Sequence, residues 1–199
     1  MKAEANKTEP VFIGYFARLR KEHPEWSGNK PPGVEAICSV SHCSVPGGFD
    51  ELFDWRDNGM RVYDTPALAW SIMQIELRPQ CDLFAYWTLA LRFVRGTIES
   101  FPVKEVSPIP MDGTFIRLGY DLVSWEPGFA FFGHSPLSCN GLADEVPVNR
   151  YYLLDTAAEA FALAPTLEVP GQPTRGEPGP YFIVEVWRQR RDLAPSSPE

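Results

Sequence analysis

The stretch Tyr181-Phe-Ile-Val-Glu-Val-Trp187 decides the fold. Within it Ile183, Glu185 and Trp187 alternate with even-numbered positions that are all apolar, and a period of two is typical of a β-strand with one better-buried face. The segment 83–94 is similarly rich in apolar and aromatic residues. We therefore predict that each of these two segments forms a strand of a sheet.

Each predicted strand closes one copy of a repeated order of features. The first feature is an apolar run with Gly-Tyr, read as Val11-Phe-Ile-Gly-Tyr-Phe-Ala17 and as Phe115-Ile-Arg-Leu-Gly-Tyr-Asp-Leu-Val123. Short segments that favour β-structure follow at 36–40 and 129–132, and each of them runs into a loop that holds a cysteine. We expect all four segments to be strands.

A predicted helix precedes the closing strand in each copy. Thr65 followed by Pro66 is an N-cap with a proline at the first helical position, and Thr156 with Glu159 three residues later is a capping box. The first helix should cover the residues that follow Pro66. The second should begin after Thr156 and end before Pro165, because proline lacks the backbone donor that the helix interior requires.

Two carboxylates occupy matched positions just before these helices. Asp64 and Asp155 could suggest a pair for acid and base catalysis. Helix capping explains both positions more simply, because a short carboxylate before the first turn accepts hydrogen bonds from free backbone donors. We interpret both residues as caps.

The repeated order predicts an α+β fold with a mixed or antiparallel sheet and a few short helices, arranged as two pseudo-symmetric β-β-α-β halves. We expect a single globular domain over residues 10–191, with candidate halves at 10–100 and 113–191 and flexible tails at 1–9 and 192–199. The spacing between matching features changes along the chain, so the match requires insertions. Chance similarity is the alternative to a duplication.

Composition and charge restrict the class of protein. The hydrophobic fraction of 44% and the charged fraction of 22% are typical of a globular chain. The formal net charge is −8, from 26 acidic and 18 basic residues, which disfavours nucleic-acid binding because that needs a basic surface. No apolar run approaches the length of a membrane span and the N-terminus is polar, so we expect a cytoplasmic protein with no membrane contact.

Cysteine chemistry supplies one alternative function. The four cysteines are too few for a disulfide scaffold, and we expect free thiols. Cys139 lies in what we interpret as an exposed turn at 135–141, five residues after His134, and a loop thiol can act as a nucleophile when its thiolate is stabilised. A hydrolase or transferase with Cys139 as nucleophile and His134 or His42 as base is therefore an alternative, and an inward-packed thiol is the simpler interpretation.

A zinc-stabilised module is the second alternative. Zinc prefers four nitrogen and sulfur ligands. If the two cysteine loops face each other, five residues could supply these ligands: Cys38, His42, Cys43, His134 and Cys139. Their spacings do not match a familiar zinc knuckle, and ordinary thiols explain the cysteines without a metal.

An acidic and aromatic segment at 49–55 is the candidate contact with a partner. Aromatic residues anchor many protein interfaces. The candidate contact residues are Phe49, Asp50, Glu51, Asp54 and Trp55. An amphipathic helix with a solvated acidic face is the simpler interpretation of the same residues.

The function predicted from these observations is protein binding rather than catalysis. The sequence has no glycine-rich dinucleotide motif, P-loop or zinc-protease motif, so we expect no cofactor. Modest size, acidic balance and abundant aromatic residues fit a small cytosolic binding protein, for example a bacterial immunity protein or antitoxin that neutralises a toxin. The oligomeric state and the partner are not specified by the sequence.

Overall fold

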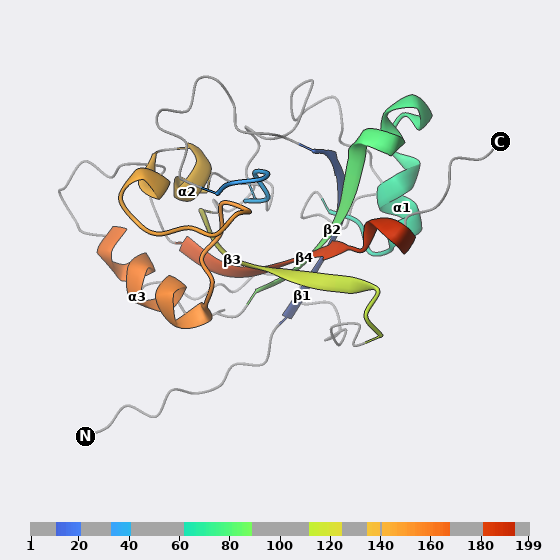
Figure 1. Cartoon of the computed structure of the whole chain (residues 1–199). Helices are drawn as coiled ribbons and strands as arrows, with labels where there is room; N and C mark the ends of the chain where they lie inside the picture. Colours follow the sequence, from blue (N-terminus) through green and yellow to red (C-terminus); the bar gives the residue numbers. More distant parts are fainter. Residues whose placement is uncertain are drawn as a thin grey trace.

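The computed structural model describes residues 11–20, 33–40, 62–88, 112–124, 135–139, 141–167 and 181–193. Within these ranges the chain forms a four-stranded sheet in the order β1-β2-β4-β3, and all neighbouring strands are antiparallel (Figure 1). The strands are β1 Val11–Leu19, β2 Cys81–Thr88, β3 Phe115–Ser124 and β4 Tyr181–Gln189. The α+β class predicted from the sequence is confirmed.

Short helices accompany the sheet. The α-helices are α1 Pro66–Ser71, α2 Pro136–Cys139 and α3 Ala157–Leu167. The 3-10 helices are η3 Ile75–Gln80, η4 Leu142–Asp144 and η5 Arg191–Leu193. Figure 1 shows α1 toward one end of the sheet and α3 toward the other. No helix within the described ranges is long and apolar enough to cross a membrane.

The β2–β4 pair lies at the centre of a local two-fold arrangement. Phe84 pairs with Arg188 near one end and Thr88 pairs with Val184 near the other, so that the pair Tyr86–Val186 lies midway. Outside this centre, β1 pairs with β2 and β3 pairs with β4. In the described residues α1 lies between β1 and β2 in the first half, and α2 and α3 lie between β3 and β4 in the second.

The Gly-Tyr runs have the same structural role in both halves. The pairing register shifts just before Gly14 in β1 and just before Gly119 in β3. The tyrosine that follows forms an isolated bridge, Tyr15 with Tyr63 and Tyr120 with Leu154. The close approach of each bridging segment explains the glycine, because a Cβ on Gly119 would lie 2.6 Å from the carbonyl oxygen of Leu154.

The helix starts agree with the predicted caps. Thr65 Oγ1 accepts a hydrogen bond from Leu68 N at 3.2 Å. At the second helix Thr156 Oγ1 accepts from Glu159 N, and the Glu159 carboxylate accepts from Thr156 N. Both halves of the predicted capping box are therefore present.

One predicted strand is absent, and one predicted helix end is wrong. Residues 36–40 do not form a strand, because their backbone bonds irregular partners: Cys38 N donates to Tyr151 O at 3.0 Å, for example. The helix predicted to end before Pro165 continues to Leu167, since the buried Ala160 and Ala164 hold it in the core and the proline removes only one donor in its last turns. The predicted strand at 129–132 and the second part of 83–94 lie outside the described residues.

The core occupies the sheet and the segments packed on it. Every residue of β2 is buried, which is typical of a central strand covered on both faces. Trp70 and Met73 pack into the larger cluster of buried residues, which includes residues of β1, β2 and β4. A second cluster joins Leu137 and Leu142 to Leu122 and Ile183 of the sheet.

Candidate functional site: an arginine cluster around Asp82

Most residues selected from the sequence lie outside the described part of the chain. These are His42, Cys43, Phe49, Asp50, Glu51, Asp54, Trp55 and His134. Their predicted roles in partner binding, metal binding or catalysis stay predictions.

The segment before Cys139 differs from the exposed turn predicted for it. Residues 135–138 are buried, and α2 ends at Cys139. Leu137 packs in the second core cluster, and Ser135 Oγ donates a hydrogen bond to Asp121 Oδ1 at 2.6 Å. The segment is therefore buried although it contains two serines, so this part of the prediction is wrong. The side chain of Cys139 itself is not among those that the structure describes.

The two cysteine side chains that the structure describes are buried free thiols. Burial raises the pKa of Cys38 to about 11, although Arg18 and Arg188 nearby lower it in part. Burial also raises the pKa of Cys81 to about 11, and its Sγ donates to Leu77 O. Neither thiol is therefore suited to act as a nucleophile at neutral pH. Within the described ranges no group of His, Cys, Asp and Glu is arranged to hold a metal ion.

Threonines, rather than the two matched carboxylates, cap the helices. The hydrogen bonds that cap α1 and α3 come from the threonine side chains. Asp155 instead accepts a hydrogen bond from Asn149 Nδ2 at 3.1 Å, and both Asp64 and Asp155 are exposed. The prediction that Asp64 and Asp155 cap the helices is therefore wrong.

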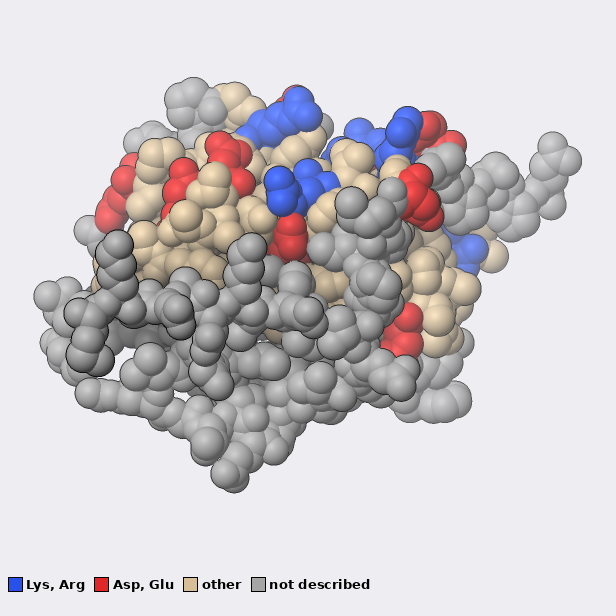
Figure 2. Space-filling view, turned by 90° about the horizontal axis from the view of Figure 1, so that it is seen from below, with Lys and Arg blue, Asp and Glu red and all other residues tan. Residues whose placement is uncertain are grey.

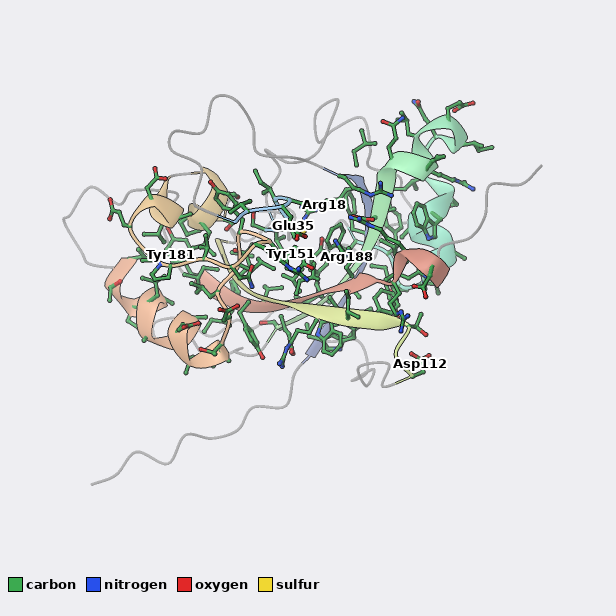
Figure 3. The ribbon with its side chains drawn as sticks, in the orientation of Figure 1. Arg18, Glu35, Asp112, Tyr151, Tyr181 and Arg188 are labelled. Atoms are coloured by element: carbon green, nitrogen blue, oxygen red, sulfur yellow. The ribbon has the colours of Figure 1, made fainter. Side chains whose placement is uncertain are left out.

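The pairing registers bring distant charged residues together where β1 ends, β2 begins and β4 ends. Arg18 of β1 is opposite Asp82 of β2, and Arg188 of β4 is opposite Phe84. Because residues two apart in a strand share a face, Asp82 and Phe84 place both arginines on the same face of the sheet. Figure 3 shows Arg18 and Arg188 in the same region of the molecule.

Three arginines surround the carboxylate of Asp82. Arg191 donates to it from Nε and Nη2, each at 3.1 Å, in the two-bond geometry that suits a guanidinium and a carboxylate. Arg20 Nε donates to Oδ1 at 3.1 Å. Arg188 Nη1 lies 3.9 Å from Oδ2, within ion-pair range but beyond hydrogen-bonding distance. We call Arg20, Arg188 and Arg191 the arginine cluster.

Arg188 is the inner member of the arginine cluster. It is 9% exposed, and its Nε has no hydrogen-bond partner among the described residues. The guanidinium carbon lies 5.3 Å from the centre of the Tyr151 ring, and Arg150 lies 4.8 Å from the same ring. Stacking on an aromatic face stabilises a guanidinium but leaves its in-plane N–H groups available for an acceptor.

The outer members of the cluster reach the surface. The side chains of Arg20 and Arg191 are 39% and 52% exposed, whereas that of Asp82 is 5% exposed. Three guanidinium groups around one carboxylate leave two positive charges in excess among the described residues. Figure 2 shows that arginine side chains also lie beside acidic ones along the upper part of the face that it views. The cluster is thus a local positive centre in a chain with an acidic balance.

Asp121 is a second buried charged group on the same face of the sheet. It is fully buried and accepts hydrogen bonds from Ser135 Oγ, from Val40 N and from Leu122 N. Nearby, Arg18 Nη1 donates to Ser39 O at 2.7 Å. These contacts attach the segment 33–40 to β1 and β3, so we interpret Asp121 and Arg18 as structural residues.

Sequence reasoning did not find the arginine cluster. The sequence shows a short basic run near its end, Arg188, Arg190 and Arg191, whereas Asp82 and Arg20 belong to no motif. Only the strand order brings Arg20, Asp82 and Arg188 together. Alternation within the strand at 181–189 would have placed Arg188 with the buried even-numbered residues, and a buried arginine was the one available signal.

Comparison with known proteins leaves the site to be interpreted from its own geometry: no family model, curated protein or solved structure matches this chain.

Proposed function

We propose that this protein acts by binding another protein, for example as a bacterial immunity protein or antitoxin that neutralises a toxin, and that the arginine cluster contacts acidic groups of the partner. The observation that carries the proposal is the excess of positive charge around Asp82, which is partly open to solvent through Arg20 and Arg191. In the same proposal the protein works in the cytoplasm.

The geometry of the cluster supports a contact role. Arginine is enriched in protein interfaces, because its planar group forms two parallel hydrogen bonds with a carboxylate. Asp82 already orients Arg191 by such a pair and holds Arg20 by a single bond. Orientation before binding lowers the entropic cost of ordering these long side chains. An acidic partner would therefore meet guanidinium groups that are already fixed in place.

The chemistry of the described thiols also favours binding over catalysis. A cysteine nucleophile needs a stabilised thiolate, whereas burial raises the pKa values of Cys38 and Cys81 to about 11. The side chains predicted to form a Cys139–His134 pair or a zinc site lie mostly outside the described residues, so both roles stay predictions. Protein binding remains the function that the geometry supports best.

The test uses the product of the gene adjacent to this one as the candidate toxin. Cells that express the candidate toxin alone are compared with cells that also express this protein, and the affinity of the purified pair is measured over a series of salt concentrations. We expect protection of growth and a complex whose affinity falls as salt rises, because exposed charges are screened.

Charge reversal identifies the surface. Replacing Arg20→Glu together with Arg191→Glu should weaken the complex by tenfold or more, mainly through a slower association rate. Arg190→Glu is the matched control, because Arg190 pairs with Asp192 at 2.9 Å and lies outside the cluster. Absence of protection and of a complex would contradict the proposed function. A complex that both variants leave unchanged would keep protein binding but exclude the arginine cluster as the contact.

A further inference from the structure

The inner position of the arginine cluster has a donor without an acceptor. Arg188 is nine-tenths buried, and its Nε has no hydrogen-bond partner in the described structure. A buried polar group without a partner loses its hydration and gains nothing in return, so such groups are rare in folded proteins. Ser39, Ser138, Trp70 and Trp187 also have buried polar atoms without a hydrogen bond among the described residues, but Arg188 is the charged group of this set and the one that lies beside two further arginines.

The outer arginines have further donors. Arg191 uses Nε and Nη2 for Asp82. Arg20 uses Nε for Asp82 and Nη2 for the carbonyl oxygen of Pro79 at 3.0 Å. The Nη1 group of each makes no hydrogen bond with the described residues. Together with Arg188, the cluster therefore has several N–H groups that can donate to an additional anion.

The charge of the missing acceptor follows from the local excess. The described groups of the cluster have two positive charges more than the single carboxylate neutralises. A carboxylate would leave one positive charge uncompensated, whereas a phosphate monoester carries a charge close to −2 at neutral pH. It also presents three acceptor oxygens to guanidinium groups that match phosphate geometry.

We propose that the arginine cluster is a binding site for a dianionic phosphate group, with Arg188 as its inner ligand and Arg20 and Arg191 as its outer ligands. Asp82 is the positioning residue, because it fixes the two outer arginines without neutralising the cluster. The ligand class is inorganic phosphate or a small phosphate monoester. This inference goes beyond the proposed function, since the free protein should bind phosphate in the absence of any protein partner.

The experiment follows the Nε–H signal of Arg188 by NMR. The protein is labelled with nitrogen-15 in arginine, the Arg188 signal is assigned by its loss in Arg188→Lys, and inorganic phosphate is added at constant ionic strength in a chloride buffer. The pH is set above the second pKa of the phosphate group, roughly 6 for an ester and somewhat higher for the free ion. We expect a saturable shift of the Arg188 signal.

Acetate and two variants give the experiment its controls. Acetate, a monoanionic carboxylate, should bind at least tenfold more weakly than phosphate. Arg191→Gln should weaken phosphate binding about tenfold, as expected for the loss of one charge-assisted interaction. Arg190→Gln should not change it, because that exposed side chain bonds Asp192 instead.

Three results would overturn the inference. The first is a linear, non-saturating response of the Arg188 signal to phosphate, and the second is equal affinity for acetate. The third is an equal effect of Arg190→Gln and Arg191→Gln, which would indicate a general surface attraction. Arg191 is half-exposed and the far-ultraviolet circular dichroism of its variant reports folding, so the comparison of affinities does not depend on replacing a buried residue; Arg188→Lys serves only to assign the signal. Failure here leaves the toxin experiment unaffected, and the reverse also holds.

Discussion

At the scale of single residues, Asp121 and Arg188 are two buried charged groups with opposite surroundings. Asp121 accepts hydrogen bonds at both carboxylate oxygens, and these bonds join three segments of the chain. Arg188 contacts Asp82 only at 3.9 Å and has a donor with no partner. Full satisfaction is typical of a structural group, whereas a buried donor without an acceptor requires an explanation, and the proposed phosphate ligand would supply one.

The Asp121 carboxyl predicts a specific dependence of stability on pH. Burial raises its pKa from 3.8 to about 7, although its hydrogen bonds and Arg18 lower the pKa in part. Between about pH 4 and pH 7 the folded state then holds a proton that the unfolded state has released. The contribution of Asp121 to the free energy of unfolding therefore falls as the pH rises through this range, by a few kcal/mol at most in order of magnitude.

The measurement compares the wild type with Asp121→Asn by urea unfolding from pH 4 to pH 8. The amide does not titrate, so the stability of the wild type relative to the variant should be greatest near pH 4 and decrease toward pH 7. A difference that stays constant across the range would show that Asp121 remains ionised in the folded state. Ser135→Ala retains the carboxyl but removes a hydrogen bond that lowers its pKa, so the pH dependence should persist and extend to higher pH.

At the scale of elements, the edge strands β1 and β3 share the same local irregularity. Each has a register shift and a glycine where a neighbouring segment forms an isolated bridge to the following tyrosine. Gly14 and Gly119 have φ angles of +153° and +150°, a backbone conformation that residues with a side chain rarely adopt. A Cβ on Gly14 would lie 2.5 Å from Val62 Cγ2. Both positions therefore require glycine for two reasons: the backbone has a positive φ, and the neighbouring segment leaves no room for a Cβ.

We predict that Gly119→Ala lowers the free energy of unfolding by about 3 kcal/mol or more, because a positive φ and a backbone clash add together. The control is Gly113→Ala, since Gly113 also has a positive φ of +79° but has open space around it. It should cost only about 1 kcal/mol. Urea unfolding of both variants provides the comparison. Equal costs would mean that the approach of Leu154 to β3 does not constrain this position.

The elements were predictable to different degrees. Thr65 and Thr156 predict their helices because capping is a local interaction that the sequence states directly. The strand at 181–189 was predictable because alternation is local as well. The segment 36–40 favours β-structure but bonds Tyr151, a residue far away in the chain, so no local pattern could show its irregular form. The helix end predicted at Pro165 was wrong because the burial of Ala164 in the core outweighs the helix-breaking effect of the proline.

At the scale of the whole molecule, the strand order creates the candidate site. The sequence shows a scattered set of arginines and an acidic balance, from which a basic site does not follow. The order β1-β2-β4-β3 places the end of β1 and the end of β4 on either side of the start of β2. Arg20, Asp82 and Arg188 meet there although their separation in the sequence is large. A site assembled by non-local pairing needs the register, and the sequence alone did not provide it.

The two-fold arrangement also distinguishes the site from the scaffold. Tyr86 and Val186 lie at the centre of the arrangement, and the Gly-Tyr devices repeat on both sides of it. The arginine cluster is not repeated in this way, since Thr88 of β2 occupies the position that corresponds to Arg188 of β4. The scaffold follows the two-fold arrangement and the arginine cluster departs from it, so the symmetry of the fold does not by itself account for the cluster.

The central claim is that the arginine cluster exists for binding rather than for stability, and the free energy of unfolding of Arg188→Met tests it most directly. Methionine keeps the apolar part of the side chain, and Asp82 keeps Arg20 and Arg191 as partners, so no buried charge is left uncompensated. We predict that the variant changes the free energy of unfolding by less than about 1 kcal/mol or stabilises the protein, because it removes an unpartnered buried donor and relieves repulsion within the cluster. A loss of about 3 kcal/mol or more, as expected for a buried ion pair that holds the fold together, would contradict the claim.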